Sequence, residues 1–140
     1  MITAVDTNVL LDVLGADPVF GRHSGLAVRR CLAEGRLIAC DVVWAETASF
    51  FESPGAAVDA LTRLGVEFFP GSEASALAAA VAWKEYRRRG GSRDRVAADF
   101  LVGSHAATTA DRLLTRDRGF YRSYFDGLTV LDPSGGEPAA

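Results

Sequence analysis

The sequence predicts an α/β fold, a central parallel sheet of about five strands flanked by helices. Short apolar runs rich in β-branched residues alternate with longer segments of helical periodicity, which is typical of a parallel sheet covered on both faces. The length of 140 residues suits one domain with a sizeable core, and no repeat or linker divides it. We expect residues 1–132 to form this domain and residues 133–140 a flexible C-terminal tail of Gly, Pro and Ala.

In the N-terminal half, the expected elements begin with a strand over 2–5 that ends abruptly at Asp6. A helix opening at Thr7 or Asn8 follows and is broken by Gly15. The apolar spacing and the breakers then predict a helix over 20–34, a strand over 37–40, a helix capped by Asp41 that ends before Pro54, and a helix over 56–64.

In the C-terminal half, a strand over 66–69 precedes the longest helix, over 73–89, which Ser72 caps. A polar loop then leads to a helix over 96–108. The remaining pattern predicts a strand over 113–116, a short turn through Phe120 and Tyr124, and a last strand over 128–131.

The composition describes a globular protein that is neither disordered nor membrane-spanning, with 49% hydrophobic and 24% charged residues. No apolar run approaches the roughly 20 residues that a bilayer span needs, and the first residues lack the features of a signal peptide. We therefore expect a cytoplasmic protein with no membrane partner. The net charge of −3 argues against a strongly cationic, nonspecific nucleic-acid binder, although bound divalent cations would reverse its sign.

Four acidic residues occupy positions that suggest one common pocket. Asp6 and Asp117 each follow a predicted strand, and acids at the carboxyl ends of neighbouring parallel strands lie close together. Glu46 shares a helix face with the apolar Val42, Val43 and Phe50, so we expect it on the core side. Asp99 lies in the first turn of the helix over 96–108.

Each acid alone has an ordinary structural explanation as a helix cap, a turn residue or the partner of an arginine. Together they would be costly, because two like charges 4 Å apart repel by roughly 4 kcal/mol at an effective dielectric constant of 20. Such a cluster needs protonation, arginines or a hard divalent cation, and carboxylate oxygens are the ligands that Mg²⁺ and Mn²⁺ prefer. No His and Cys set indicates zinc.

The sequence resembles the PIN-domain ribonucleases, most closely the VapC-type toxins of bacterial toxin–antitoxin pairs. The resemblance spans nearly the whole chain and implies a single PIN-like domain. Four stretches carry it in order: AVDTNVLLD (4–12), VVWAETASFF (42–51), AADFLVGSHA (97–106) and LLTRDRGFYRSYF (113–125).

The resemblance implies a Mg²⁺- or Mn²⁺-dependent cleavage of RNA phosphodiester bonds. Position by position, Asp6, Glu46, Asp99 and Asp117 match the family's catalytic, metal-binding acids, and Thr7, Asn8 and Thr115 match its accessory polar residues. It also implies a cognate antitoxin and a toxin homodimer.

Basic side chains near the predicted acidic pocket are candidates for contacts to RNA phosphates. They are Arg93, Arg95, Arg116 and Arg118. For each one, an ordinary solvated surface position is an equally good interpretation. The nearby aromatic residues of 120–124 are better explained by core packing or partner contact than by base stacking. His105 follows Asp99 by six residues, about 120° around the helix, so we expect it to be structural.

Three alternatives to a toxin ribonuclease stay open. The first is an RNA-processing PIN nuclease without an antitoxin. The second is an aspartate-based phosphatase with Asp6 as nucleophile, although Asn8 stands where such phosphatases normally have a second acid. The third is an RNA- or partner-binding module without catalysis.

Overall fold

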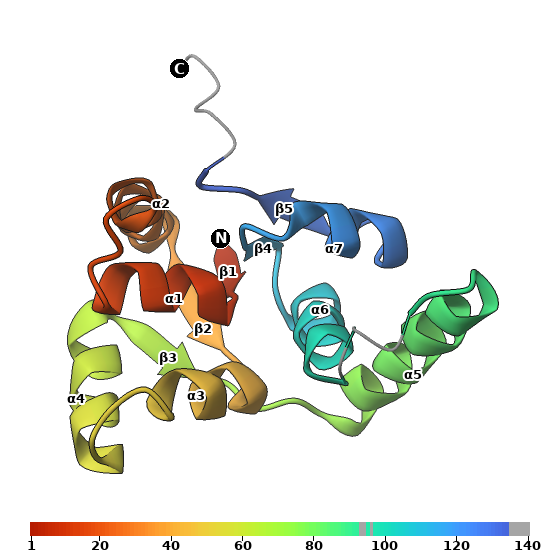
Figure 1. The fold of residues 1–140 in the computed structure, drawn as a ribbon, viewed down its shortest axis with the longest axis horizontal. Helices are drawn as coiled ribbons and strands as arrows, with labels where there is room; N and C mark the ends of the chain where they lie inside the picture. The colour runs from red at the N-terminus through yellow and green to blue at the C-terminus, as the bar shows by residue number, and fades with distance from the viewer. Residues whose placement is uncertain (93–94, 96, 135–140) are drawn as a thin grey trace.

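A computed structural model describes residues 1–92, 95 and 97–134 and contains one five-stranded sheet. The strand order is β3-β2-β1-β4-β5, and all neighbouring strands pair in parallel (Figure 1). The strands are β1 (Ile2–Val5), β2 (Arg36–Ala39), β3 (Val66–Phe68), β4 (Arg112–Leu114) and β5 (Thr129–Leu131). The predicted α/β fold with a parallel sheet is confirmed.

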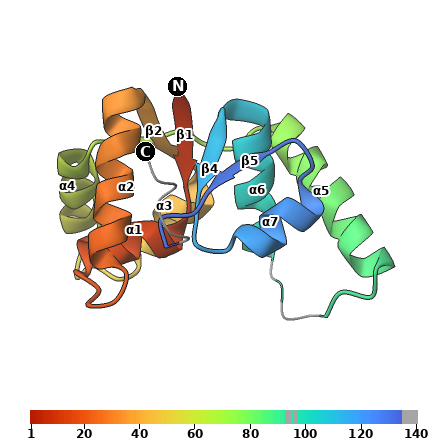
Figure 2. The ribbon, with the colours of Figure 1, turned by 90° about the horizontal axis from the view of Figure 1, so that it is seen from above.

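Seven helices are formed by the described residues, and they cover both sides of the sheet. They are α1 (Thr7–Leu14), α2 (Gly21–Glu34), α3 (Asp41–Ala48), α4 (Pro54–Leu64), α5 (Glu73–Arg88), α6 (Ala97–Thr109) and α7 (Arg118–Tyr124). In Figure 2, α1, α2 and α4 gather on one side of the strands, and α5, α6 and α7 on the other. From β1 the chain continues to β2 and β3 on one side of β1, and it then crosses over to β4 and β5 on the other side of β1. This reversal creates a topological switch point between β1 and β4, where ligands of such sheets bind.

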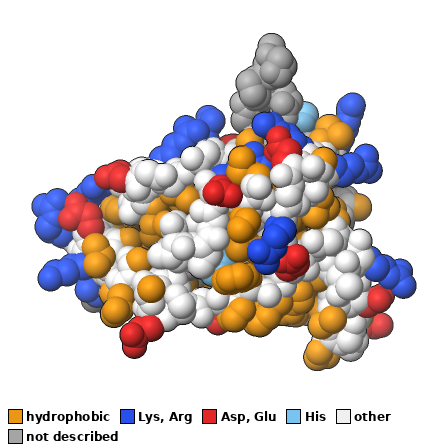
Figure 3. Space-filling model, turned by 180° about the vertical axis from the view of Figure 1, so that it is seen from behind, with side chains coloured by type: hydrophobic (Ala, Val, Ile, Leu, Met, Phe, Trp, Pro, Cys, Tyr) orange, Lys and Arg blue, Asp and Glu red, His pale blue; other side chains and the backbone are white. Residues whose placement is uncertain are grey.

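The core lies on the central strands and is largely aliphatic, with aromatic rings added on the α5–α7 side. Leu37, Ile38, Leu113 and Leu114 have no exposed surface. Phe100 of α6 stacks on Trp83 with ring centroids 5.3 Å apart and an interplanar angle of 7°. Acidic, basic and apolar side chains are interspersed over the face shown in Figure 3. None of the helices that the structure describes is both long enough and apolar enough to span a membrane.

Three local predictions were wrong. The segment predicted as a turn is α7, because Phe120, Tyr121 and Tyr124 lie on one helical face and pack against neighbouring aromatic rings. The helix after β2 does end before Pro54, but it ends at Ala48 and so leaves out Phe50, which we expected within it. Its N-cap is Cys40, not Asp41. The described part of the expected C-terminal tail is 133–134, and 135–140 fall outside the described residues.

Candidate active site

The switch point brings Asp6 and Thr115 level with each other on neighbouring strands. β1 and β4 pair Val5 with Leu114, so the next residue of each strand continues the same register. The Asp6 backbone N–H donates to the Leu114 carbonyl oxygen over 2.9 Å. Asp117 comes two residues after Thr115, and its backbone N–H donates to the Thr115 hydroxyl over 3.0 Å. The carboxyl ends of the two strands therefore place Asp6 and Asp117 around one threonine.

The Asp6 carboxylate is the buried centre of this site, with 8% of the residue exposed. Its Oδ2 accepts hydrogen bonds from Thr115 Oγ1 over 2.8 Å and from the Tyr121 hydroxyl over 3.1 Å. Its Oδ1 accepts from the Thr7 backbone N–H over 2.8 Å. Burial raises the pKa of Asp6, and the three hydrogen bonds oppose that rise, while the charge of Asp99 adds to it. The three hydrogen bonds therefore do not fully compensate the Asp6 carboxylate for the hydration that its charged form loses on burial.

Glu46 reaches the same region from α3 through Thr7. The Thr7 hydroxyl donates to Glu46 Oε1 over 2.7 Å, while the Thr7 backbone N–H bonds Asp6. The expectation that Glu46 lies on the core side of its helix was wrong, because Glu46 is exposed and Val43 and Thr47 form the buried stripe of α3. Glu46 therefore lies at the solvent side of the site, one threonine away from Asp6.

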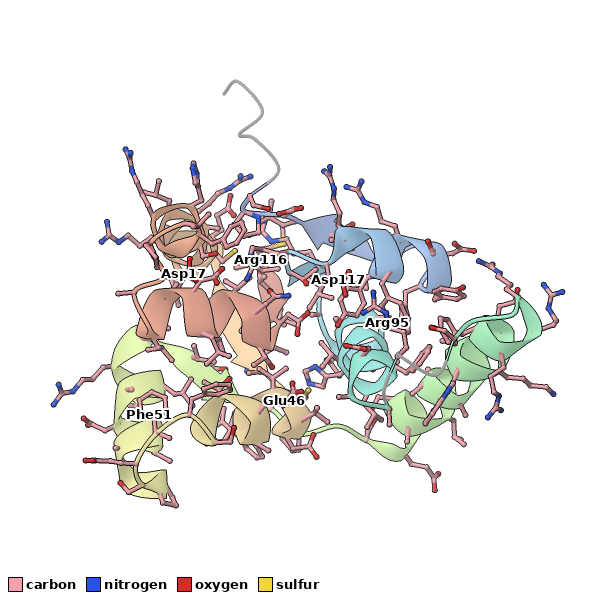
Figure 4. All side chains as sticks on the ribbon, in the orientation of Figure 1. Asp17, Glu46, Phe51, Arg95, Arg116 and Asp117 are labelled. Carbon is pink, nitrogen blue, oxygen red and sulfur yellow. The ribbon has the colours of Figure 1, made fainter. Side chains whose placement is uncertain are left out.

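Asp99 and Asp117 share a single arginine. Arg95 Nη1 donates to Asp117 Oδ2 over 2.6 Å and lies 3.5 Å from Asp99 Oδ2. Arg95 and Asp117 lie side by side in Figure 4. The Arg95 guanidinium also covers the Phe120 ring, with Cζ 4.2 Å from the ring centroid. Arg95 thus supplies the positive charge between two of the four acids.

The accessory polar residues tie the two strand ends together. Asn8 Nδ2 lies 3.5 Å from Asp6 Oδ2 and 3.4 Å from Thr115 Oγ1. Asn8 Oδ1 accepts the Arg116 backbone N–H over 3.2 Å. Through these contacts the start of α1 is bonded to the segment that follows β4, so the relative positions of Asp6 and Asp117 are held by both elements.

The basic residues proposed as phosphate contacts have different surroundings. Arg116 is bound to the buried Asp12 of α1, with Nε 2.7 Å from Oδ2 and Nη2 3.0 Å from Oδ1. Arg118 is about half exposed and lies 3.6 Å from Asp132. Arg95 is held by the acids, and Arg93 lies outside the described residues. Of these residues, Arg118 keeps the most exposed side chain in the described part of the chain.

Two features of the site escaped the sequence analysis. Tyr121, which we expected to serve packing or partner contact, is 1% exposed and donates to Asp6. Asp12 is 3% exposed and accepts from Ser24 Oγ over 2.7 Å as well as from Arg116. A spacing signal for Asp12 existed, since it lies one helical turn after Asn8 on α1. No sequence signal indicated that the Tyr121 hydroxyl would reach Asp6.

The donor chemistry fits a hard divalent cation, because four carboxylates from four elements approach one edge of the sheet. Arg95 already places a positive charge between two of them. Within the described residues, no three Asp, Glu, His or Cys side chains are grouped so that they could hold a metal ion as they stand. Binding would therefore require the acids to move closer together as Arg95 gives up part of its contact.

Two of three comparisons with known proteins found matches. The family model described as PIN domain matches residues 3–126. No match was found among curated proteins.

Similar solved structures include VapBC2 from Rickettsia felis bound to a promoter DNA fragment, with 18% identity and a TM-score of 0.73 over 94% of this chain and 98% of that chain. VapBC-1 from nontypeable Haemophilus influenzae has 18% identity and a TM-score of 0.72, over 95% of this chain and 98% of that one. FitAcB from Neisseria gonorrhoeae has 19% identity and a TM-score of 0.69, with the same coverage. At these identities the likeness concerns the fold. The family match spans most of the sequence and coincides with the elements that carry the acidic residues, so this chain belongs to the PIN domain family.

Proposed function

We propose that this chain is a Mg²⁺- or Mn²⁺-dependent ribonuclease and the toxin of a toxin–antitoxin pair. The observation that carries the proposal is the arrangement of four acids around the switch point of a PIN domain. Asp6 and Asp117 follow neighbouring strands, Glu46 is linked to the Asp6 end through Thr7, and Asp99 is linked to Asp117 through Arg95. An acidic centre of this kind suits phosphodiester hydrolysis, where charge must be neutralised and a water activated. Asp6, Asp99, Glu46 and Asp117 would hold the metal.

The protein side chains have separate roles in this mechanism. When bound, the metal supplies a water of lowered pKa and neutralises charge on the phosphoryl group. Thr115 and Tyr121 keep Asp6 oriented by donating to its Oδ2. Thr7 holds Glu46 at the solvent side, where it can accept a proton from an attacking water. Arg95 moves from Asp117 towards the RNA phosphate, and Arg118 adds a second phosphate contact from α7.

The toxin part of the proposal rests on the fold neighbours. VapBC2, VapBC-1 and FitAcB share this chain's fold over nearly its whole length. The VapC resemblance of the four sequence motifs points the same way. On this basis we propose a cognate antitoxin, a toxin homodimer, and a cytoplasmic location where RNA is available.

An aspartyl-phosphate mechanism is less compatible with the geometry. Both carboxylate oxygens of Asp6 accept hydrogen bonds, and the residue is 92% buried, so its attack on a phosphorus atom would break these contacts. An RNA-processing nuclease without an antitoxin would use the same catalytic residues and differs only in its biological partner.

The test is cleavage of single-stranded RNA by the purified chain with Mg²⁺, with Mn²⁺ and with EDTA. Asp117→Asn should lower metal-dependent cleavage by about 100-fold or more, and the matched control Asp126→Asn, an exposed acid after α7, should not. Equal cleavage by both variants, or cleavage that persists in EDTA, contradicts the mechanism. Growth arrest on induced expression that Asp117→Asn abolishes supports a toxin, and cleavage without growth arrest favours RNA processing.

A further inference from the structure

Tyr121 brings a firmly held hydroxyl to the buried end of the acidic site. The residue lies on α7 and is 1% exposed. Its ring meets the rings of Phe120 and Phe125, with centroids 5.1 Å and 6.2 Å away. Because these neighbours enclose the ring, the position of the hydroxyl is set by the packing of α7 and not by the acids that it approaches.

The Tyr121 hydroxyl lies within the electrostatic reach of three of the four acids. It donates to Asp6 Oδ2 over 3.1 Å. Burial raises the pKa of Tyr121, and the charges of Asp6, Asp99 and Asp117 raise it further. The phenol therefore stays protonated at neutral pH and remains a hydrogen-bond donor to the Asp6 carboxylate.

The hydrogen bonds divide the two oxygens of Asp6 unequally. Each oxygen of an ionised carboxylate offers about two lone pairs. Oδ2 accepts from Thr115 Oγ1 over 2.8 Å and from Tyr121, so both of its lone pairs are engaged, and Asn8 Nδ2 lies 3.5 Å from the same oxygen. Among the described residues, Oδ1 accepts the Thr7 backbone N–H alone, over 2.8 Å, and so keeps one lone pair.

This division bears on which cation the site can hold. Ca²⁺ takes about six to eight oxygen ligands and binds a carboxylate through one or both of its oxygens, whereas Mg²⁺ requires an octahedral shell and usually keeps several waters. A carboxylate that offers a single lone pair on Oδ1 suits the smaller ion and denies Ca²⁺ a second oxygen. The two O–H donors on Asp6 Oδ2 therefore act against the larger ion.

We propose that Tyr121 is a positioning residue that makes the site selective for Mg²⁺ and Mn²⁺ over Ca²⁺, because its hydroxyl withholds Asp6 Oδ2 from the cation. The proposal rests on the proposed metal-dependent function and adds the residue that decides which ion is bound. Thr115 withholds Oδ2 in the same way, but its hydroxyl also accepts the Asp117 backbone N–H. The Tyr121 hydroxyl makes its one hydrogen bond within the described residues to Asp6, so it can be removed with the ring kept.

The experiment measures cation binding by the purified metal-free chain and needs no RNA. Electron paramagnetic resonance of free Mn²⁺ gives the affinity for Mn²⁺, and displacement of bound Mn²⁺ by Mg²⁺ or Ca²⁺ gives the affinity for each of these ions. In Tyr121→Phe, Mg²⁺ and Mn²⁺ should bind about tenfold more weakly, the lower end of the loss expected when a partner of a metal-binding side chain is removed. Ca²⁺ loses the same orientation of Asp6 but gains access to Oδ2, so the ratio of Ca²⁺ to Mg²⁺ affinity should rise by about tenfold.

Tyr86→Phe is the matched control, because it removes a buried hydroxyl that donates to a backbone carbonyl and not to an acid. The Tyr86 hydroxyl donates to the Ser92 carbonyl oxygen over 2.7 Å, and the residue is 8% exposed. This variant should keep the wild-type ratio. Thr115→Val removes the other O–H donor of Asp6 Oδ2 and should raise the ratio as Tyr121→Phe does. Thermal unfolding shows which variants are folded, and Thr115→Val decides the question if Tyr121→Phe is not.

A purely structural role for Tyr121 would weaken the binding of all three ions equally, so an unchanged ratio in Tyr121→Phe overturns the proposal. A ratio that changes as much in Tyr86→Phe does the same. Metal-dependent RNA cleavage by a chain whose ion preference is insensitive to Tyr121 leaves the ribonuclease and removes this inference. An ion preference that Tyr121→Phe abolishes, in a chain that cleaves no RNA, does the reverse. A wild-type chain that binds no divalent cation contradicts both.

Discussion

The ion pair between Asp12 and Arg116 should contribute strongly to stability, although neither residue is one of the proposed metal ligands. Arg116 donates to both oxygens of Asp12, whose side chain is 4% exposed, and Ser24 supplies a third hydrogen bond. The Arg116 guanidinium also lies over Phe20, with Cζ 3.9 Å from the ring centroid. Replacing Arg116 by Met keeps most of the apolar length and leaves the Asp12 carboxylate buried without its cation.

Breaking a buried pair on one side costs about 3–5 kcal/mol, because a buried charge is left uncompensated. The side chain of Arg116 is 26% exposed, so water can partly replace it and the lower end applies. At about 2–4 °C of melting temperature per kcal/mol for a domain of this size, Arg116→Met should lower Tm by about 10 °C. Thermal and urea unfolding followed by circular dichroism measure this directly.

Arg63→Met is the matched control, because Arg63 pairs with Asp59 at 3.3 Å and both side chains are more than half exposed. It should change stability by less than about 0.5 kcal/mol. The double variant Asp12→Leu/Arg116→Met should recover most of the loss, since it leaves no buried charge. The reasoning is refuted if Arg116→Met is as mild as Arg63→Met. A double variant no more stable than Arg116→Met would show that the lost packing on Phe20, not the unpaired carboxylate, explains the effect.

Three further perturbations test other parts of the structure. Arg95→Gln should lower the stability of the metal-free protein by about 1 kcal/mol or less and increase the rise in Tm that Mg²⁺ or Mn²⁺ produces; an equal rise in both proteins would contradict the compensating role of Arg95. Gly103→Ala should destabilise by about 1–3 kcal/mol in urea unfolding, because a Cβ there would lie 2.4 Å from the Phe125 ring, whereas Gly25→Ala, with open space, should stabilise α2 by up to about 1 kcal/mol. Because burial raises the folded-state pKa of Asp6 above 3.8, its contribution stabilises below pH 3.8 and is lost as pH rises through that raised pKa. Metal-free Asp6→Asn should therefore gain stability relative to wild type over this window, and parallel pH profiles would refute the shift.

Much of the sheet was predictable because its signals are local. The strand at the N-terminus ends at Asp6, and β4 is followed by Asp117, so the apolar runs alone placed two acids at one edge. Parallel pairing of β1 with β4 then brought these strand ends together. Glu46 was harder, because α3 carries apolar residues on several faces, and only the packed structure shows that Val43 and Thr47 are buried while Glu46 is exposed.

The pairing of charges was not predictable, because it depends on distances between elements far apart in the chain. Arg95 and Arg116 flank the acids in similar ways in the sequence, yet Arg95 contacts Asp117 and Arg116 turns away to Asp12. Arg116 contacts the buried Asp12 carboxylate, which lies between α1 and α2 and is also bonded by Ser24 of α2. No such contact to Asp12 is made by Arg95. Sequence spacing indicates that arginines are near the site, but not which of them contacts the candidate acids.

The arrangement explains how one site can combine a buried acid with readiness for a cation. Asp6 is fixed by Thr115, Tyr121 and the Thr7 backbone, so little ordering is left to be done at that ligand. Asp99 and Asp117 are instead held by Arg95, whose side chain is 31% exposed and can exchange its carboxylate contacts for water. A divalent cation would then replace one guanidinium between these acids with a higher charge, and the released Arg95 would remain next to the place where the phosphate of the proposed substrate would bind. Because the rigid and the exchangeable halves of the site lie on different elements, binding of the proposed cation would change the positions of a few side chains at the starts of α6 and α7 and leave the sheet unchanged.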